Sequence, residues 1–188
     1  MSRIHFQRLE VERDRDAVIV WDGQGNEMHV FEGGYPSGLW SFPIPGRELR
    51  VQLLSNGATT GWGFCADQIA TTEMPTCLIE SEHPYANDYR NSWTITNPNP
   101  DAQQSMIHFA FLDVEEPWDP VTIADGADNE IQRIVGFHAQ GLWSAPVPGR
   151  TVKIGLSTDG SSTRWGLCVD RIVTLHSTYL PITIRQYP

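Results

Sequence analysis

The feature that most constrains the fold is an internal repeat at a constant offset of 103 positions. Residues 4–72 align without a gap with residues 107–175. Residues 38–47 read GLWSFPIPGR and residues 141–150 read GLWSAPVPGR. A polar turn before Trp-Gly also occurs twice, as SNGATTGWGFC and as STDGSSTRWGLC. Matches of this density predict a tandem duplication in which both copies share one fold.

Each copy has the residue pattern of short β-strands. Strand formers separated by Asp-Gly and Pro-Gly turns are typical of antiparallel hairpins. In the second copy these strands are expected at residues 107–114, 121–123, 152–156 and 165–173. Their spacing of about ten residues predicts a β-sandwich, and no stretch sustains the 3.6-residue periodicity of a helix.

Residues 73–106 occur once, so the second copy has a lead-in segment and strand that the first lacks. We predict an all-β chain of two tandem antiparallel sandwich modules, residues 1–74 and 75–188, the first without its N-terminal strand segment. Residues 180–185 in the C-terminal tail have the pattern of an edge strand. We expect this tail, or a partner chain, to fill the edge left open in the first module.

Composition limits the kinds of partner and the cellular compartment that we expect for this chain. Thirteen basic against 23 acidic residues give a net charge of −10, which argues against nucleic acid, and no apolar run is long enough for membrane insertion. Cys65, Cys77 and Cys168 are too few for a disulfide framework, and Cys65 and Cys168 are expected to be reduced strand residues, with Cys77 in a linker. With no leader peptide and no Asn-x-Ser/Thr acceptor, we expect an intracellular protein, with a secreted one as the alternative.

Several motifs in the second copy resemble those of the CUB domain. They are Pro84-Tyr85-x3-Tyr89-x3-Trp93-x-Ile95, Leu112-Asp113-Val114-Glu115, Asp119-x-Val121, Asp125-Gly126 and Asp159-Gly160-Ser161 followed by Trp165-Gly166. Residues 80–175 resemble a whole module and residues 4–72 one without its first strands. The cysteine pairs of secreted CUB domains are absent, as in cysteine-poor CUB-like modules of large intracellular proteins, including some ubiquitin ligases. Similar modules accompany bacterial peptidases. The resemblance implies a jelly-roll sandwich of two antiparallel sheets.

The resemblance also implies a calcium site, because many CUB domains bind Ca²⁺ through a Tyr, a Glu and two Asp. The matching positions are Tyr89, Glu115, Asp119 and Asp159. Oxygen ligands of this kind suit a hard cation, and in the family these carboxylates also receive a lysine from a protein ligand. The first copy has Asn56 where the second has Asp159, so calcium is expected in the second copy only. The alternative is that these acids are solvated loop charges.

No motif of an enzyme is present: there is no His-Glu-x-x-His, no Gly-x-Ser-x-Gly and no phosphate-binding loop. We therefore expect a non-catalytic protein-binding or structural module, a subunit of a larger assembly. The alternatives are a carbohydrate-recognition accessory module that uses the tryptophans, and an accessory domain of a larger hydrolase. Core or inter-repeat packing is the favoured role of the paired tryptophans Trp40, Trp62, Trp143 and Trp165. His5 and His108 are interpreted as structural.

Overall fold

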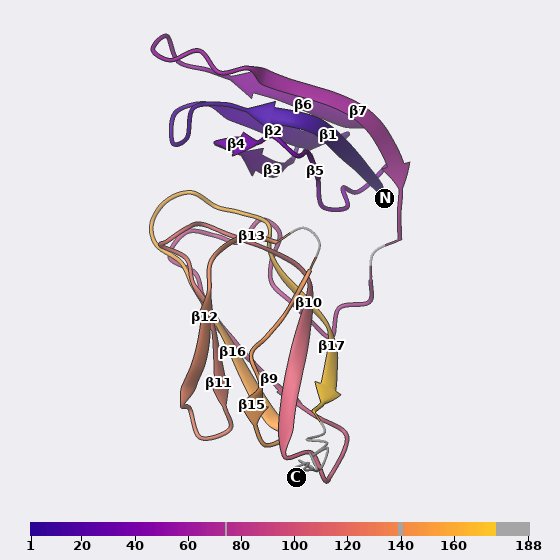
Figure 1. Ribbon diagram of the computed structural model, residues 1–188, viewed down its shortest axis with the longest axis vertical. Coiled ribbons are helices and arrows are strands. Elements are labelled where there is room, and N and C mark those ends of the chain that lie inside the picture. Colours follow the sequence, from indigo (N-terminus) through magenta and orange to yellow (C-terminus); the bar gives the residue numbers. More distant parts are fainter. Residues whose placement is uncertain (74, 139–140, 176–188) are drawn as a thin grey trace, which may run out of the picture.

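The computed structural model describes residues 1–73, 75–138 and 141–175, and every regular element in these ranges is a β-strand (Figure 1). The expected all-β class is confirmed. No helix among these residues is long and apolar enough to cross a membrane. The strands are β1 (Ser2–Glu10), β2 (Ala17–Asp22), β3 (Glu27–Phe31), β4 (Gly34–Tyr35), β5 (Leu39–Trp40), β6 (Leu49–Leu54), β7 (Gly63–Thr71), β8 (Ile79–Glu80), β9 (Arg90–Thr96), β10 (Gln104–Val114), β11 (Val121–Asp125), β12 (Glu130–Ile134), β13 (Gly136–His138), β14 (Leu142–Trp143), β15 (Val147–Pro148), β16 (Thr151–Ser157) and β17 (Gly166–Thr174).

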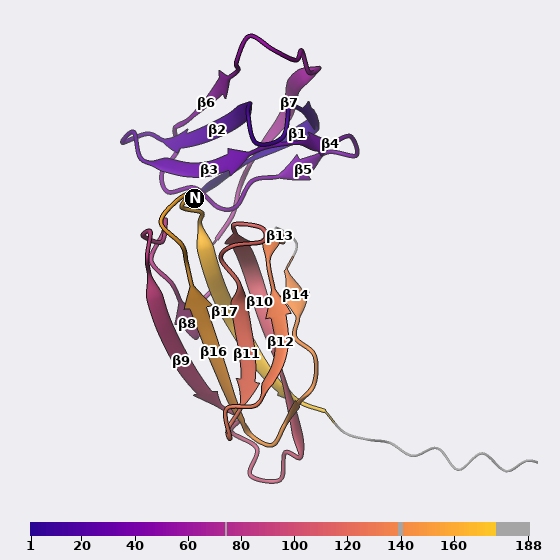
Figure 2. The same cartoon turned by 90° about the vertical axis from the view of Figure 1, so that its left-hand side faces the viewer.

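The strands form four antiparallel sheets that make two sandwiches. In the N-terminal sandwich, β1, β4, β5 and β7 face β2, β3 and β6. In the C-terminal sandwich, β8, β10, β13, β14, β15 and β17 face β9, β11, β12 and β16. The sheets of the N-terminal sandwich lie across one end of the C-terminal sandwich (Figures 1 and 2).

Both sandwiches use the same strand pairings. His5 is opposite Trp40 between β1 and β5, and His108 is opposite Trp143 between β10 and β14. The long pair β1–β7 is irregular immediately after His5, and the pair β10–β17 is irregular immediately after His108. The offset of 103 therefore holds in strand register as well as in sequence.

The core of each sandwich follows from alternation along the strands. In β16, Val152, Ile154 and Leu156 are buried, and the residues between them are partly exposed. Successive side chains of a strand point to opposite faces, so one face of β16 joins the apolar core. Tyr85, from the segment before β9, is part of the same core.

The two sandwiches differ at one edge. β17 pairs with β8 and β16 pairs with β9, whereas β7 pairs with β1 and β6 with β2, and no other described strand pairs with β6 or β7. Leu53 of β6 is consequently 45% exposed, while Leu156 at the equivalent position is 1% exposed. The N-terminal sandwich thus lacks its first strands, as the sequence predicts. The edge strand expected at residues 180–185 lies outside the described residues.

Cys77 and Cys168 form a disulfide with a Cα–Cα distance of 5.4 Å, so the expectation of a reduced Cys168 and a linker Cys77 was wrong. The pairing of β8 with β17 brings Cys77 next to Cys168. Ile79 is opposite Val169, and Leu78 N donates to Val169 O at 2.7 Å. Cys65, the counterpart of Cys168, is free. The cysteines therefore no longer support the intracellular expectation.

Aromatic side chains join the two sandwiches. The ring of Phe42 lies 5.1 Å from those of Phe111 and Phe137 and 5.0 Å from that of Trp165, measured between centroids. Phe42 and Trp165 are buried, so Trp165 has the inter-repeat packing role expected for it. Aromatic rings of this size bury a large apolar area, which favours one fixed arrangement of the sandwiches.

His29 and Asp113 are buried beside this aromatic cluster. Their Nδ1 and Oδ2 atoms are 3.7 Å apart, which is too long for a hydrogen bond. Phe42 N donates to His29 Nε2 at 3.1 Å, so Nε2 carries a lone pair and the ring is neutral. Burial lowers the pKa of His29 to about 3 and raises the pKa of Asp113 to about 7.

We expect the disulfide to stabilise the C-terminal sandwich, because it closes a loop with a sequence separation of 91. The Cys77→Ser variant should lower the free energy of unfolding by about 2–4 kcal/mol in guanidinium denaturation. The matched variant Cys65→Ser should change it by less than about 0.5 kcal/mol. A thiol titration of the unfolded, unreduced protein should detect Cys65 alone, and detection of all three cysteines would contradict the pairing.

The buried carboxyl of Asp113 should make stability depend on pH. The folded protein keeps this proton up to about pH 7 because the pKa is raised, whereas the unfolded chain loses it near pH 4. Between these values the unfolded state binds fewer protons, so the contribution to stability falls as pH rises. The melting temperature of Asp113→Asn minus that of the wild type should therefore increase from pH 4 to pH 7 and then level off. A difference that does not vary with pH would refute this.

Candidate metal site at one end of the C-terminal sandwich

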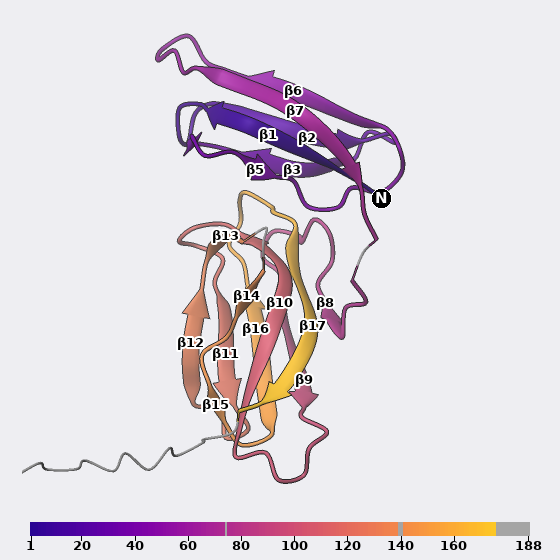
Figure 3. The ribbon, with the colours of Figure 1, turned by 45° about the vertical axis from the view of Figure 1, so that its right-hand side comes forward.

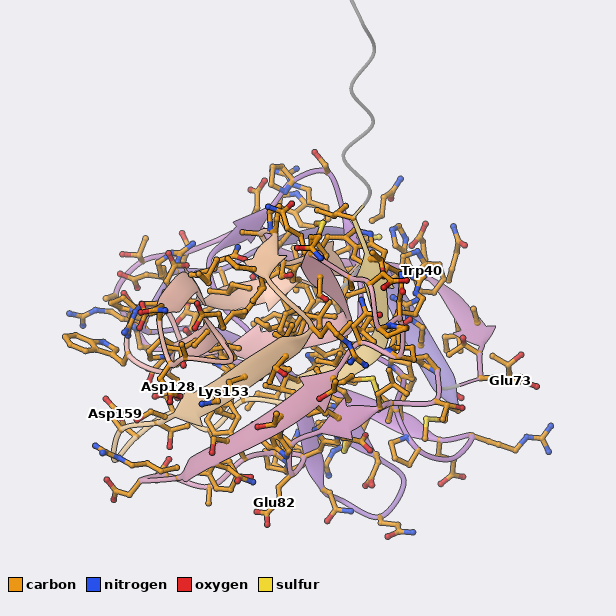
Figure 4. All side chains as sticks on the ribbon, turned by 90° about the horizontal axis from the view of Figure 1, so that it is seen from below. Trp40, Glu73, Glu82, Asp128, Lys153 and Asp159 are labelled. Carbon is orange, nitrogen blue, oxygen red and sulfur yellow. A yellow bond between two sulfur atoms is a disulfide. The ribbon has the colours of Figure 1, made fainter. Side chains whose placement is uncertain are left out.

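Three carboxylates converge at the end of the C-terminal sandwich that faces the N-terminal one. Glu115 and Asp119 follow β10, and Asp159 follows β16. One carboxylate oxygen of each lies within 4.8 Å of the others. Asp119 is buried and the other two are partly exposed. Figure 4 shows Asp159 at the margin of the molecule, on the opposite side of the view from Trp40.

The backbone fixes the positions of these acids. Asp119 N donates to Glu115 O at 3.1 Å, so the short loop between them is a single turn. Asp159 N donates to Asp119 Oδ1 at 2.9 Å and ties the loop after β16 to that turn. Asp159 Oδ1 in turn accepts from Ser161 N at 2.8 Å, as in an Asx turn. Hydrogen bonds therefore hold the two loops together at the carboxylate of Asp119.

A buried tyrosine connects the acids to the segment that precedes β9. The hydroxyl of Tyr85 donates to Asp119 Oδ2 at 2.6 Å and accepts from Glu115 N at 3.1 Å. Burial, followed by the hydrogen bond to Asp119, raises the pKa of Tyr85, so the hydroxyl keeps its proton.

The sequence assigned the tyrosine position to Tyr89, whose hydroxyl has another partner among the described residues. It accepts a hydrogen bond from Asn91 Nδ2 at 2.9 Å, and the ring packs against the C-terminal core. The structure brings Glu115, Asp119 and Asp159 together, and the hydroxyl bound to them is that of Tyr85. Both tyrosines lie in the same motif, and only the greater burial of Tyr85 separates them.

The environment disfavours negative charge on two of the acids. Burial raises the pKa of Glu115, a hydrogen bond from the Ser162 side chain opposes that shift, and the charges of Asp119 and Asp159 add to it. Burial likewise raises the pKa of Asp119, although the hydrogen bond from Tyr85 opposes the shift. Glu115 Oε2 is buried and accepts no hydrogen bond from the described residues. A buried oxygen without a donor is costly, and carboxylate oxygens are the ligands that a hard divalent cation such as Ca²⁺ prefers.

The N-terminal counterpart of this site is filled by an amide. Asn56 N donates to Asp16 Oδ1 at 2.8 Å, and Asn56 Nδ2 donates to Glu12 Oε2 at 3.4 Å. A side-chain N–H group of Asn56 therefore interacts with Glu12 where the C-terminal sandwich has the carboxylate of Asp159. Two carboxylates and one amide donor are a poorer cation site than three carboxylates.

Two of the tryptophans are surface residues, contrary to the packing role expected for them. Trp62 is 52% exposed and Trp143 is 40% exposed. The guanidinium of Arg8 lies 4.4 Å from the centroid of Trp62, and that of Arg171 lies 5.4 Å from Trp143. Such cation–π contacts occupy one face of each ring.

A histidine–aspartate pair that sequence reasoning missed lies on each sandwich. His5 Nδ1 bonds Asp67 Oδ1 at 2.5 Å, and His108 Nδ1 bonds Asp170 Oδ1 at 2.6 Å. The partners are distant in sequence, on the paired strands β7 and β17, so only the strand register could have revealed them.

The chain is similar to short parts of larger proteins, and no protein-family model matches it. It is 28% identical over 144 residues, 64% of its length, to mouse E3 ubiquitin-protein ligase HERC2, and 32% identical over 95 residues, 47% of its length, to human HERC2. It spans 3% and 2% of these relatives. Among solved structures, it is similar to the CUB1-EGF-CUB2 domains of human MASP-1/3 (TM-score 0.37, 14% identity, 89% of this chain and 87% of that one) and of rat MASP-1 (TM-score 0.34, 13% identity, 90% and 86%).

The two tyrosines should respond differently to loss of the hydroxyl. Tyr85→Phe leaves Asp119 Oδ2 and the Glu115 amide without a buried partner, and should lower the free energy of unfolding by about 1–3 kcal/mol in urea denaturation. Tyr89→Phe, whose hydroxyl bonds to the exposed Asn91, should cost less than about 0.5 kcal/mol. Equal costs for the two variants would contradict the placement of Tyr85.

Proposed function

We propose that this chain is a pair of CUB-like modules that binds other proteins without catalysing a reaction, and that its C-terminal module holds Ca²⁺. The observation that carries the proposal is the convergence of Glu115, Asp119 and Asp159 within 4.8 Å, with a buried oxygen of Glu115 lacking a donor. The order of the CUB motifs along residues 80–175 and their incomplete repetition in residues 4–72 support it.

Calcium fits this donor set better than a transition metal does. All the converging atoms are carboxylate oxygens, and Ca²⁺ accepts irregular sets of six to eight oxygens completed by water. No histidine or cysteine takes part in the group. A cation between the acids would also offset the burial and the mutual repulsion that raise the pKa of Glu115 and Asp119.

A protein ligand suits the exposed side of the same site. Asp159 is partly exposed, so one of its oxygens can face a lysine or arginine of a partner while the other faces the cation. The net charge of −10 favours basic partner surfaces. We propose that the chain works as a subunit of a larger assembly. Since it spans only 2–3% of HERC2, no ligase activity is transferred to it.

The carbohydrate alternative finds less support. Sugar recognition by stacking needs an open aromatic face, and guanidinium groups lie over Trp62 and Trp143. No specific observation favours an accessory role beside a hydrolase.

Calcium titration tests the metal. In calorimetry the wild type should bind Ca²⁺ with a measurable heat, Asp159→Ala should lose that heat, and the matched variant Asn56→Ala should retain it. At a free Ca²⁺ concentration of 100 times Kd, the ion should stabilise the fold by about 2.7 kcal/mol. Binding should weaken as pH falls, because the raised pKa values of Glu115 and Asp119 make protons compete with the ion. Equal heats from the wild type and Asp159→Ala would rule out this site.

Capture of partner proteins tests the proposed protein binding at the acidic group. Affinity purification from the native source, read by mass spectrometry, should recover the same proteins with the wild type and with Asn56→Ala. Chelation of calcium and the Asp159→Ala substitution should each remove the partners bound at this site. If neither treatment changes the captured proteins, the acidic group is not a protein-binding site.

A further inference from the structure

The C-terminal sandwich shows what the N-terminal sandwich lacks. Residues 79–96, which we name the cover segment, run along two strands of the C-terminal sandwich. β8 pairs with β17, and β9 pairs with β16 from Thr96 opposite Thr151 to Arg90 opposite Ser157. Between β8 and β9, Tyr85 inserts its side chain into the core. No described segment does the same for β6 and β7.

The N-terminal sandwich has a cavity where the C-terminal sandwich has Tyr85. The cavity measures about 210 Å³, and its lining includes Val11, Asp16, Leu53, Gly61 and Gly63. At the offset of 103, these residues correspond to Val114, Asp119, Leu156, Arg164 and Gly166. Tyr85 bonds two of the latter group, through its N–H to Arg164 O at 3.1 Å and through its hydroxyl to Asp119. The cavity is therefore the counterpart of the Tyr85 site.

Two equivalent glycines show that the path of the cover segment is empty in the N-terminal sandwich. A Cβ built on Gly166 would lie 2.0 Å from Ser81 Oγ and 3.1 Å from Glu82 O. A Cβ built on Gly63 would meet nothing within 4 Å. Both glycines have positive φ, so the backbone turns alike in the two places and only the covering chain differs.

Asp16 leaves one carboxylate oxygen without a partner beside this cavity. Its Oδ1 accepts from Asn56 N, as Asp119 Oδ1 accepts from Asp159 N. Its Oδ2 accepts no hydrogen bond from the described residues, whereas Asp119 Oδ2 accepts the hydroxyl of Tyr85. Asp16 is a buried residue, but its Oδ2 is not among the fully buried atoms without a partner, so this oxygen reaches solvent. A hydroxyl donor in the cavity would satisfy it.

Apolar side chains on β6 and β7 are uncovered. Leu53 and Leu54 on β6 and Ile69 on β7 are all exposed. Figures 1 and 3 show that β6 and β7 lie on the far side of the N-terminal sandwich from the C-terminal sandwich, which therefore does not cover them. An apolar sheet edge with free backbone groups is a template for one more strand.

We propose that the edge formed by β6 and β7 binds an extended segment of a partner protein, which pairs antiparallel with both strands and places a tyrosine in the cavity beside Asp16. This is β-strand addition, in which backbone hydrogen bonds supply affinity and side-chain pockets supply specificity. The partner segment has a tyrosine followed by a strand with apolar residues at alternate positions, as Tyr85 is followed by Trp93 and Ile95. The inference rests on the proposed protein-binding function and is independent of calcium.

The partner is a different protein rather than a second copy of this chain. In each copy the cover segment is already paired with β16 and β17, and the Cys77–Cys168 disulfide holds its beginning in place. It is therefore not free for donation to another molecule.

A labelled synthetic peptide with the sequence of residues 79–96 is the probe. It should bind the full chain saturably in fluorescence anisotropy. A peptide with alanine in place of Tyr85 should bind about tenfold more weakly or worse, because the cavity then loses a large buried side chain. The protein variants Asp16→Asn and Leu53→Lys should weaken binding of the tyrosine peptide. Asp159→Ala should not, which separates this site from the calcium site.

Each other outcome overturns the proposal. Absence of saturable binding, or equal binding of the tyrosine and alanine peptides, shows that the cavity does not take a tyrosine. Binding only to a chain that ends at Leu175 identifies the tail as the occupant. A dimer that dissociates on Leu53→Lys identifies a second copy. If calcium-dependent capture of partners persists while peptide binding fails, the proposed function stands and only this inference is wrong.

Cys65 allows the register to be tested directly, because it is the counterpart of Cys168. A peptide of residues 77–96 is prepared with its Cys77 as a mixed disulfide with thionitrobenzoate. The Cys65 thiolate should attack the peptide sulfur, form the peptide–protein disulfide and release thionitrobenzoate, faster than with a scrambled peptide of the same composition. Cys65→Ser should release none. Equal rates for the native and scrambled peptides would contradict the proposed register.

Discussion

The hydrogen bond from the Tyr85 hydroxyl to Asp119 is the contact on which the C-terminal sandwich depends. It fastens the cover segment over the core, and it holds the buried acid to which the loop of Asp159 is tied. The same hydroxyl also bonds the Glu115 amide, so one phenol orients two turns. Packing of the Tyr85 ring and placement of the acidic group therefore depend on the same side chain. Where the tyrosine is missing, in the N-terminal sandwich, a cavity and an uncovered edge appear together.

Comparison of the two copies distinguishes residues that maintain the sandwich from residues that can have a function. The long pairs β1–β7 and β10–β17 have the same register, so the paired positions maintain the sandwich. Function is expected where the copies diverge. Asn56 replaces Asp159 and removes the third carboxylate. Cys65 has no disulfide partner, whereas Cys168 has one. The C-terminal module has three converging carboxylates, and the N-terminal module has an uncovered edge among the described strands.

Local pattern predicted the strands and the missing lead-in segment, because alternation and turns depend on neighbours in sequence. It could not predict the disulfide, since β8 has two residues and no periodicity that marks it as a strand. The motif contains both Tyr85 and Tyr89, and only burial shows that Tyr85 is the one bonded to Asp119. The pattern suggested packing roles for the tryptophans but did not identify Phe42, although its alignment with Ala145 marks a position where the two copies differ.

Native-state hydrogen exchange of the free protein measures most directly whether one sandwich is closed and the other open. Amides on the outer edges of β6 and β7 have no strand partner among the described residues, so they should exchange far faster than their counterparts in β16 and β17, which bond to β9 and β8. Equal protection at positions 103 residues apart would show that the N-terminal edge is already covered, and would contradict an open site for a partner strand.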